Sequence, residues 1–192
     1  MELIMASKYK GYMGRVVMFD LSTGELTEYP WTDKERELFI GGKTMASKIM
    51  ADCFTGKETP FSEENLIIIS TGPLTGTGAP SSSRFNISTL SPQTGITTSS
   101  NCGGRFGYYL KKAGLDAVIL KGKCKERSWL EINNGEFTLH NAEDLWGLKT
   151  GPAQEALKEK HKLANGKLMK YGNVVIGPAG ENQVLYASVI SD

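Results

Sequence analysis

Apolar and polar positions alternate near the start of the chain in a way that predicts a β-hairpin. A β-rich run, residues 15–21, leads through the turn Ser22-Thr23-Gly24 into a second alternating run, residues 25–29. Two such runs joined by a short turn with glycine are typical of a hairpin. Apolar positions between residues 32 and 50 then recur at helical spacing, with Thr32-Asp33 as a candidate N-cap and an interruption at Gly41-Gly42.

A short apolar run, Leu66–Ile69, predicts a buried strand that ends at Gly72-Pro73-Leu74-Thr75-Gly76. The same order of elements then recurs. Residues 129–132 and 136–140 predict a second hairpin, 151–162 a second helix, and 173–176 a second strand that ends at Gly177-Pro178-Ala179-Gly180. Because chance matches rarely keep one order, the repetition predicts an internal duplication in which residues 14–90 and 128–192 superpose.

The two predicted halves end differently. The first continues through a strand, residues 84–90, to a glycine loop, Asn101-Cys102-Gly103-Gly104, and an amphipathic helix, residues 106–113. The second reaches a matching strand, residues 184–190, and the sequence then stops at Asp192. The pattern therefore predicts a mixed α+β domain with substantial sheet, and a fragment cut inside a repeat.

Composition narrows the class of protein. The 192 residues carry a formal net charge of +1, which predicts neither nucleic-acid nor membrane binding. The longest apolar runs, Leu66–Ile69 and Ala117–Leu120, are far shorter than a membrane span, and no signal peptide is recognisable. Three cysteines without a CxxC motif argue against a disulfide framework, and against a zinc or iron–sulfur site made by this chain alone. We expect a cytoplasmic, globular protein.

Most catalytic chemistries lack candidates in this sequence. Hydrolytic and metal sites need convergent histidine, serine, cysteine or carboxylate sets, and the two histidines, His140 and His161, are expected at the surface. Gly42-Lys43-Thr44 resembles the end of a Walker loop, but Glu37 stands where its first glycine belongs. A dinucleotide fingerprint fails because Ser81 takes the place of its third glycine.

Two glycine-rich loops remain as candidates for binding an anion. Residues 72–84 combine three glycines and five hydroxyl side chains with Arg84, whose guanidinium can pair bidentately with a phosphate. Residues 101–104 precede a predicted helix, whose N–H groups and dipole attract anions. The alternatives are a tight turn with a surface arginine, and an asparagine N-cap with packing glycines. Cys102 is either a thiol facing the ligand or a small packing residue.

Several motifs together resemble the N-terminal domain of the aldehyde ferredoxin oxidoreductase family, tungsten and molybdenum enzymes with a bis-pyranopterin cofactor. They are GPLTGTGAPSSSR, SPQTG, NCGGRFGYYLKKAGLDAVILKGK and IGPAGEN, in the family's order. The resemblance covers residues 14–192 and leaves residues 1–13 as an N-terminal extension. It implies a saddle-like mixed-sheet domain of two similar halves. That domain cradles two pyranopterins around one tungsten or molybdenum atom, with magnesium bridging their phosphates.

The resemblance also implies roles for three residues. Arg84 matches a contact to pterin or phosphate, Asn101 matches a backbone carbonyl that holds the bridging magnesium, and Gly103 allows close approach of the cofactor. Cys102 takes no role from the family. By the same resemblance, the second pterin loop would begin just past Asp192, and the cysteines of a 4Fe–4S cluster and the acid/base residues would belong to later C-terminal domains.

The implied function is that of a cofactor-binding domain in an enzyme that oxidises an aldehyde, or a related carbonyl compound, to a carboxylic acid. Electrons would pass through the iron–sulfur cluster to ferredoxin, and a homodimer is common in the family. The fragment alone is not expected to be catalytic, and neither the substrate nor the choice of tungsten over molybdenum follows from the sequence. The alternatives are a metal-free binding or assembly module with the same fold and, less favoured, a nucleotide- or flavin-binding protein.

Overall fold

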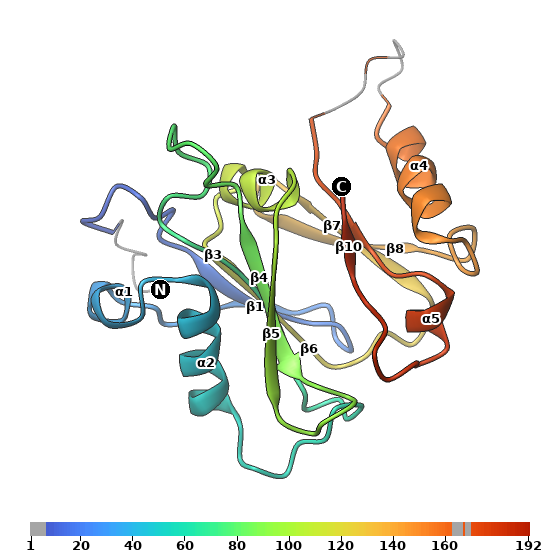
Figure 1. Cartoon of the computed structure of the whole chain (residues 1–192), viewed down its shortest axis with the longest axis horizontal. Helices are drawn as coiled ribbons and strands as arrows, with labels where there is room; N and C mark the ends of the chain where they lie inside the picture. Colours follow the sequence, from blue (N-terminus) through green and yellow to red (C-terminus); the bar gives the residue numbers. More distant parts are fainter. Residues whose placement is uncertain (1–6, 163–166, 168–169) are drawn as a thin grey trace.

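A six-stranded mixed sheet forms the centre of the molecule (Figure 1). The computed structural model describes residues 7–162, 167 and 170–192. The strands are β1 (Val16–Asp20), β2 (Leu26–Glu28), β3 (Ile67–Thr71), β4 (Phe85–Leu90), β5 (Thr97–Cys102) and β6 (Ala117–Lys121). Their order is β2-β1-β6-β3-β4-β5, with β1 and β6 parallel and every other pair antiparallel. The fold is therefore mixed α+β with a mixed sheet, as predicted.

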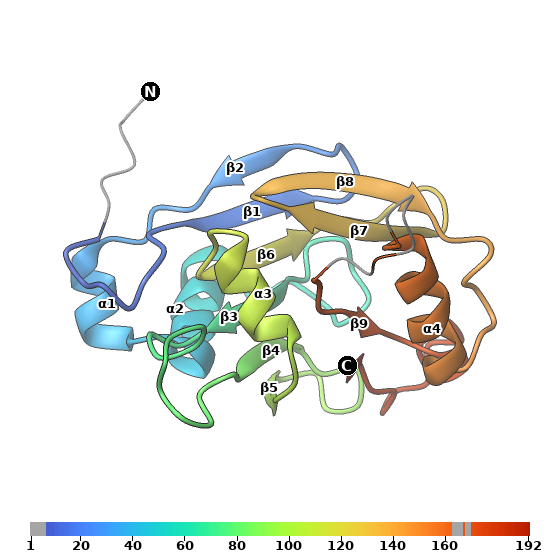
Figure 2. The same ribbon diagram turned by 90° about the horizontal axis from the view of Figure 1, so that it is seen from above.

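Each face of this sheet is covered by a different set of elements. On one face lie α1 (Asp33–Phe39) and α2 (Gly42–Cys53), where Met45, Ile49 and Met50 pack against alternate residues of β1, β3 and β6. On the other lie α3 (Phe106–Lys112) and the hairpin of β7 (Ser128–Asn133) and β8 (Glu136–Asn141), which runs beside β1 (Figure 2). Both faces of the central strands are thus buried.

The remaining elements form a smaller body beside the sheet. They are α4 (Thr150–Lys160), β9 (Val174–Val175), α5 (Pro178–Glu181) and β10 (Ile190–Ser191). Ala153 and Leu157 of α4 pack with Val175 against Trp129, Leu145 and Leu148. β9 pairs antiparallel with β10, as β3 does with β4. The repeated order of elements is therefore present, while the superposition of the two halves stays a prediction. In the described residues no helix is long and apolar enough to cross a membrane.

Most of the predicted elements are confirmed. Both hairpins form, and the first helical stretch divides into α1 and α2 at Ile40-Gly41, one residue before the predicted interruption at Gly41-Gly42. α1 starts after Thr32, whose backbone N–H donates to the Glu35 carboxylate at 2.9 Å in a capping box. The strands predicted at 66–69, 84–90 and 173–176 and the helices predicted at 106–113 and 151–162 are present, with small shifts at their ends.

The strand predicted at 184–190 is wrong, except for its last residue. Residues 184–189 are irregular, and Leu185, Tyr186 and Val189 are exposed. The Val184 N–H bonds the Ala179 carbonyl at 2.9 Å, which closes the turn after α5 instead of a ladder. A strand persists only where a neighbour pairs with it. In the described part of the chain that neighbour is β9, which is two residues long.

Two strands were not predicted. β5 consists almost entirely of polar residues and shows no alternating apolar pattern. It is a strand because its backbone pairs with β4 along its whole length. It takes in Asn101 and Cys102, so the predicted glycine loop is reduced to Gly103-Gly104. β6 contains the apolar run at 117–120, and it lies between β1 and β3 with Val118 and Ile119 fully buried. It pairs in parallel with β1, which lies about a hundred residues away in the sequence. A local pattern of residues cannot predict such a distant partner.

Candidate functional site

Arg84 ends the loop that joins β3 to β4, residues 72–84. Its side chain is exposed and forms no ion pair with the described residues. Its backbone is held from within the loop, because the buried Thr75 hydroxyl donates to the Arg84 carbonyl at 2.8 Å and to the Ser82 carbonyl at 3.1 Å. The guanidinium is therefore free to bind a ligand, while its Cα is fixed.

The pairing of β4 with β5 brings the other two predicted residues to the same end of the sheet. Phe85 is opposite Cys102, so Arg84 and Gly103 leave the paired strands side by side. Asn101 is opposite Asn86, and its side-chain oxygen accepts a hydrogen bond of 3.0 Å from the buried Asn86 amide. Ser88 donates to the Asn86 oxygen at 2.6 Å and orients that amide. The structure thus brings Arg84, Asn101 and Gly103 together.

The start of α3 packs directly on this end of the sheet. A Cβ added at Gly107 would lie 3.2 Å from the Phe85 Cβ and 3.3 Å from the Arg84 carbonyl carbon. A side chain here would require the Arg84 backbone or Phe85 to move by a few tenths of an ångström, so glycine favours the close approach of the helix. Ser83 also donates to the Gly104 carbonyl at 2.8 Å, which ties the two loops together. Arg84 and Gly103 are therefore held by one packed unit.

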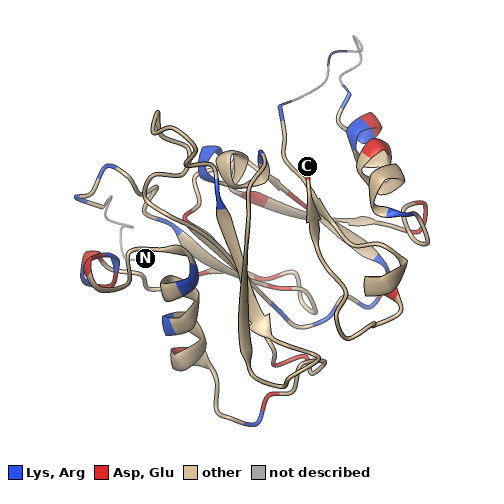
Figure 3. Ribbon diagram, viewed as in Figure 1, with Lys and Arg blue, Asp and Glu red and all other residues tan. Residues whose placement is uncertain are grey.

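The shape and charge of this region fit a phosphate-bearing ligand. A Cβ built at Gly72, Gly78 or Gly103 would meet no described atom within 4 Å, so the backbone there is open to a ligand. Basic positions lie on α3 and at the start of β4 (Figure 3). Arg105, the N-cap of α3, is largely exposed, but its guanidinium is paired with the Asp192 carboxylate at 3.2 Å. The exposed Arg84 guanidinium, which has no such partner among the described residues, is therefore the group that suits an anion.

Two expectations about this loop change in detail. The helix N-cap is Arg105 and not Asn101, because Asn101 and Cys102 belong to β5. Cys102 is partly buried against the core cluster that contains Phe85 and Leu110, which favours a packing role for it over a thiol that faces a ligand. The residue pattern at 97–102 does not predict β5, because this segment is held extended by its pairing with β4.

Both histidines were expected at the surface, and this holds for His140, whose side chain is 38% exposed, but not for His161, which is largely buried beside the same glutamate. His140 Nε2 lies 2.9 Å from one oxygen of Glu131, and His161 Nε2 lies 3.8 Å from the other. The His161 side chain is 13% exposed and stacks on Tyr171, while His140 stacks on Trp129. A hollow of about 400 Å³ borders the cluster. The register of the predicted hairpin, which sets Trp129 opposite His140, could have revealed half of this arrangement.

No metal cluster of protein side chains accompanies either region. Within the residues that the structure describes, no three histidine, cysteine, aspartate or glutamate side chains are placed to hold a metal ion.

Comparison with known proteins gives one consistent family. The model of the aldehyde ferredoxin oxidoreductase N-terminal domain matches residues 16–192. The tungsten-containing aldehyde ferredoxin oxidoreductase of Thermococcus kodakarensis is 35% identical over 182 residues, which cover 95% of this chain and 29% of that protein. The Pyrococcus furiosus enzyme of the same name is 34% identical over 187 residues, with the same two coverages.

Relatives with other names share the same domain. The WOR-like subunit of an aliphatic sulfonate oxidoreductase from Pyrococcus furiosus is 29% identical over 191 residues, covering 94% of this chain and 30% of that protein. Among solved structures, the active site complex BamBC of benzoyl coenzyme A reductase, in complex with 1,5-dienoyl-CoA, matches with a TM-score of 0.86 and 35% identity. That match covers 95% of this chain and 27% of the other. The chain thus spans less than a third of the length of these relatives.

Proposed function

The chain belongs to the aldehyde ferredoxin oxidoreductase family, as its N-terminal domain, and we propose on this basis that it binds the pyranopterin cofactor of a longer tungsten or molybdenum oxidoreductase. The observation that carries the proposal is the convergence of Arg84, Asn101 and Gly103 at one end of the β4–β5 pair. The relatives are named for different substrates, an aldehyde, an aliphatic sulfonate and a coenzyme A thioester. A domain common to all of them is suited to hold what they share.

Each of the three residues has a distinct task in this proposal. The Arg84 guanidinium binds a phosphate or pterin oxygen through its planar fork of donors. Gly103 lets the cofactor approach the backbone, where a side chain would otherwise stand. The Asn101 backbone carbonyl would help to hold a magnesium ion beside the cofactor. When bound, the cofactor supplies the metal at which the substrate is oxidised, and these residues bind and orient it.

The finer features of the function are proposed by the same route. Residues 14–192 form the pterin-binding domain and residues 1–13 an extension. The enzyme oxidises an aldehyde or related carbonyl compound to a carboxylic acid and passes electrons through a 4Fe–4S cluster to ferredoxin. The remaining C-terminal domains complete it, it acts in the cytoplasm, and it forms a homodimer.

An internal duplication with a saddle-like shape is part of the proposal as well. It is supported by the recurrence of hairpin, helix and strand, and by the equivalent positions of Gly72-Pro73 after β3 and Gly177-Pro178 after β9. In each half, the strand before the Gly-Pro pair runs antiparallel to the strand after it. Two equivalent sites would suit a cofactor with two pterins. Superposition of residues 14–90 on 128–192 tests this point.

The proposal is tested by substituting Arg84 in the full-length protein, expressed in a host that makes the cofactor. Arg84→Ala should lose most of its pterin and tungsten or molybdenum, measured per chain, and Arg84→Lys should restore only part, because an ammonium does not reproduce the bidentate fork. The melting temperature of the cofactor-free form should stay unchanged, since the guanidinium makes no ion pair with described residues.

Arg127→Ala is the matched control, because Arg127 is an exposed arginine whose partner is Glu143, at 2.9 Å. It should keep its full metal content. Unchanged metal in Arg84→Ala would reduce Arg84 to a surface turn residue. Wild-type protein that never acquires metal or pterin would favour the metal-free binding or assembly module.

A further inference from the structure

We infer that a buried ion pair, Lys111–Asp116, and the N-terminal strap, residues 7–14, are positioning elements for the glycine loop, residues 72–84. The inference rests on the proposed function, because it concerns how the chain holds Arg84 toward the cofactor. It gives the strap a task in the site, although the strap lies outside the residues that match the family model.

The ion pair closes directly on the strap. Lys111 Nζ and Asp116 Oδ1 are 2.6 Å apart, and the two side chains are only 4% and 1% exposed. The Asp116 carboxylate also accepts hydrogen bonds from the backbone N–H groups of Met13, at 2.9 Å, and Gly14, at 2.8 Å. Lys111 in turn donates to the Gly11 carbonyl at 2.9 Å. Both buried charged groups therefore form hydrogen bonds to the backbone of the strap.

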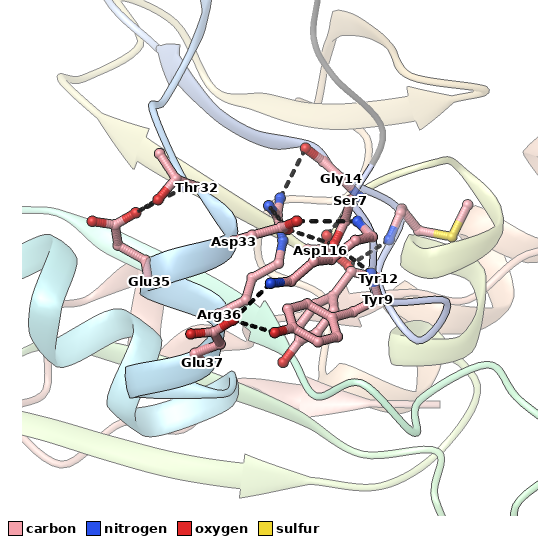
Figure 4. Close-up of polar contacts among 12 residues, drawn as sticks. Ser7, Tyr9, Tyr12, Gly14, Thr32, Asp33, Glu35, Arg36, Glu37 and Asp116 are labelled. Carbon is pink, nitrogen blue, oxygen red and sulfur yellow. Dashed lines mark hydrogen bonds and ion pairs between the residues drawn. The ribbon is translucent and has the colours of Figure 1, made fainter.

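A second buried cation holds the strap from the side of α1 (Figure 4). Arg36 donates to the Gly14 carbonyl at 3.1 Å and to Asp33 at 3.0 Å. Asp33 also accepts from the Ser7 hydroxyl at 2.7 Å. The Tyr12 ring lies 5.5 Å from Lys111 Nζ and 5.6 Å from Arg36 Cζ, within range of a cation–π contact with each. The strap is thus bonded to α1 and α3 at once.

The strap, Gly41 and Asp116 also contact the start of the glycine loop. A Cβ at Gly11 would lie 2.7 Å from the Pro73 carbonyl oxygen, and one at Gly41 would lie 2.5 Å from the Thr71 carbonyl oxygen. The Asp116 carbonyl accepts from both the Thr71 N–H, at 2.9 Å, and the Thr71 hydroxyl, at 2.8 Å. The same residue that binds the strap by its side chain therefore binds the root of the loop by its backbone.

Thr75 links the start of the glycine loop to Arg84 at its end. A Cβ added at Gly76 would lie 3.0 Å from the Lys111 Cβ, so the first turn of the loop packs against the aliphatic part of the Lys111 side chain. The Thr75 hydroxyl, in that turn, donates to the Arg84 carbonyl at 2.8 Å. The chain of contacts therefore runs from the strap, through the ion pair and Thr75, to the backbone of Arg84. A shift of the strap should displace Arg84 while the sheet stays intact.

Gly11→Ala in the full-length protein tests this inference. The added methyl must push the strap or Pro73 aside, because its three nearest heavy atoms all belong to Pro73. We expect faster amide hydrogen exchange in a peptide that spans residues 72–84, and loss of more than half of the tungsten or molybdenum per chain. Exchange in β6 and the melting temperature of the cofactor-free protein should stay unchanged. Gly151→Ala is the control, because a Cβ there meets open space.

Lys111→Met is the stronger variant, but it leaves the Asp116 carboxylate buried without a counter-ion and can unfold the protein. The decision therefore rests on Gly11→Ala, with Arg84→Ala measured in the same preparation. If Arg84→Ala keeps its metal, the proposed function fails. If Arg84→Ala loses its metal but Gly11→Ala keeps both its metal and slow exchange in the loop, the positioning role is overturned and the proposed function stands. A Gly11→Ala protein that loosens everywhere also overturns it, since the strap would then be a general structural element.

Discussion

The two hairpins of this protein have nearly the same turn sequence and very different places in the fold. Thr23-Gly24-Glu25 in the first matches Asn134-Gly135-Glu136 in the second. Yet β1 lies inside the six-stranded sheet, while β7 and β8 form a separate two-stranded sheet over its face. The difference is in the strands. β1 buries Val16, Val17 and Phe19 on both of its faces, whereas no residue of β7 is fully buried. The apolar residues on both faces of β1, and not the turn, explain why the first hairpin joins the six-stranded sheet, with β2 at its edge, and the second does not.

The helices that follow the two hairpins also differ in burial, and again the element of the first half is the more deeply buried one. α2 buries four residues against the sheet, including Met45 and Ile49 with no exposed surface. α4 buries two, Ala153 and Leu157, against a small cluster. The first half therefore has a deep core, and the second depends on a shallow one. The following substitutions test that contrast.

The largest effect is expected in the deep core. Ile119→Ala in β6 removes a fully buried side chain between α2 and the sheet, and should lower the free energy of unfolding by about 2–5 kcal/mol. Urea denaturation of the domain measures this value. A change below about 1 kcal/mol, the size typical of surface sites, would show that this core is loosely packed.

A smaller and more local effect is expected in the shallow core. Leu157→Ala should cost about 2 kcal/mol, at the lower end of the same range, because its cluster is small and one side is open to solvent. Hydrogen exchange should quicken in α4 and β9 and stay slow in β6. Equally faster exchange in both regions would mean that the two halves unfold as one unit. The difference in burial between them would then cause no difference in local stability.

The smallest effects should come from exposed carboxylates, and they depend on pH. In the first half, hydrogen bonds from the Thr55 backbone and hydroxyl and from the Gly56 N–H hold the pKa of Glu58 at about 2. A depressed pKa contributes stability that is present above the unfolded value and is lost as the pH falls toward the folded one. The lower melting temperature expected for Glu58→Gln at pH 7 should therefore converge on wild type as the pH drops below about 4.5.

Asp144 is the counterpart in the second half, where a hydrogen bond from Lys160 lowers the pKa of the carboxyl group. Asp144→Asn should shift the melting temperature less than Glu58→Gln, because a flexible lysine is a weaker constraint than three donors within two residues. Melting curves between pH 7 and pH 3 compare the pair. A larger shift in melting temperature for Asp144→Asn would show that the exposed carboxylate of the second half contributes more stability than that of the first.

Much of the candidate site could be predicted, but its assembly could not. The chemistry of Arg84 and the openness of Gly103 are legible in the residue types and in the family motifs. That they leave the sheet side by side follows only from the register of β4 with β5, a strand without an apolar pattern. The Lys111–Asp116 pair was missed because two charges five residues apart give no sign that they are buried, or that residues 11–14 close over them.

The amino-acid sequence by itself determined both hairpins, the helix start at Thr32, the break before α2 and the family. These features depend on turn chemistry, capping and periodicity within a few residues, or on motifs kept in order. Tertiary structure alone decided that β6 pairs in parallel with β1, that residues 184–189 form no strand, and that His140 and His161 meet at Glu131. Each of these outcomes depends on which distant segment supplies a backbone partner or excludes water, and no local pattern contains that information.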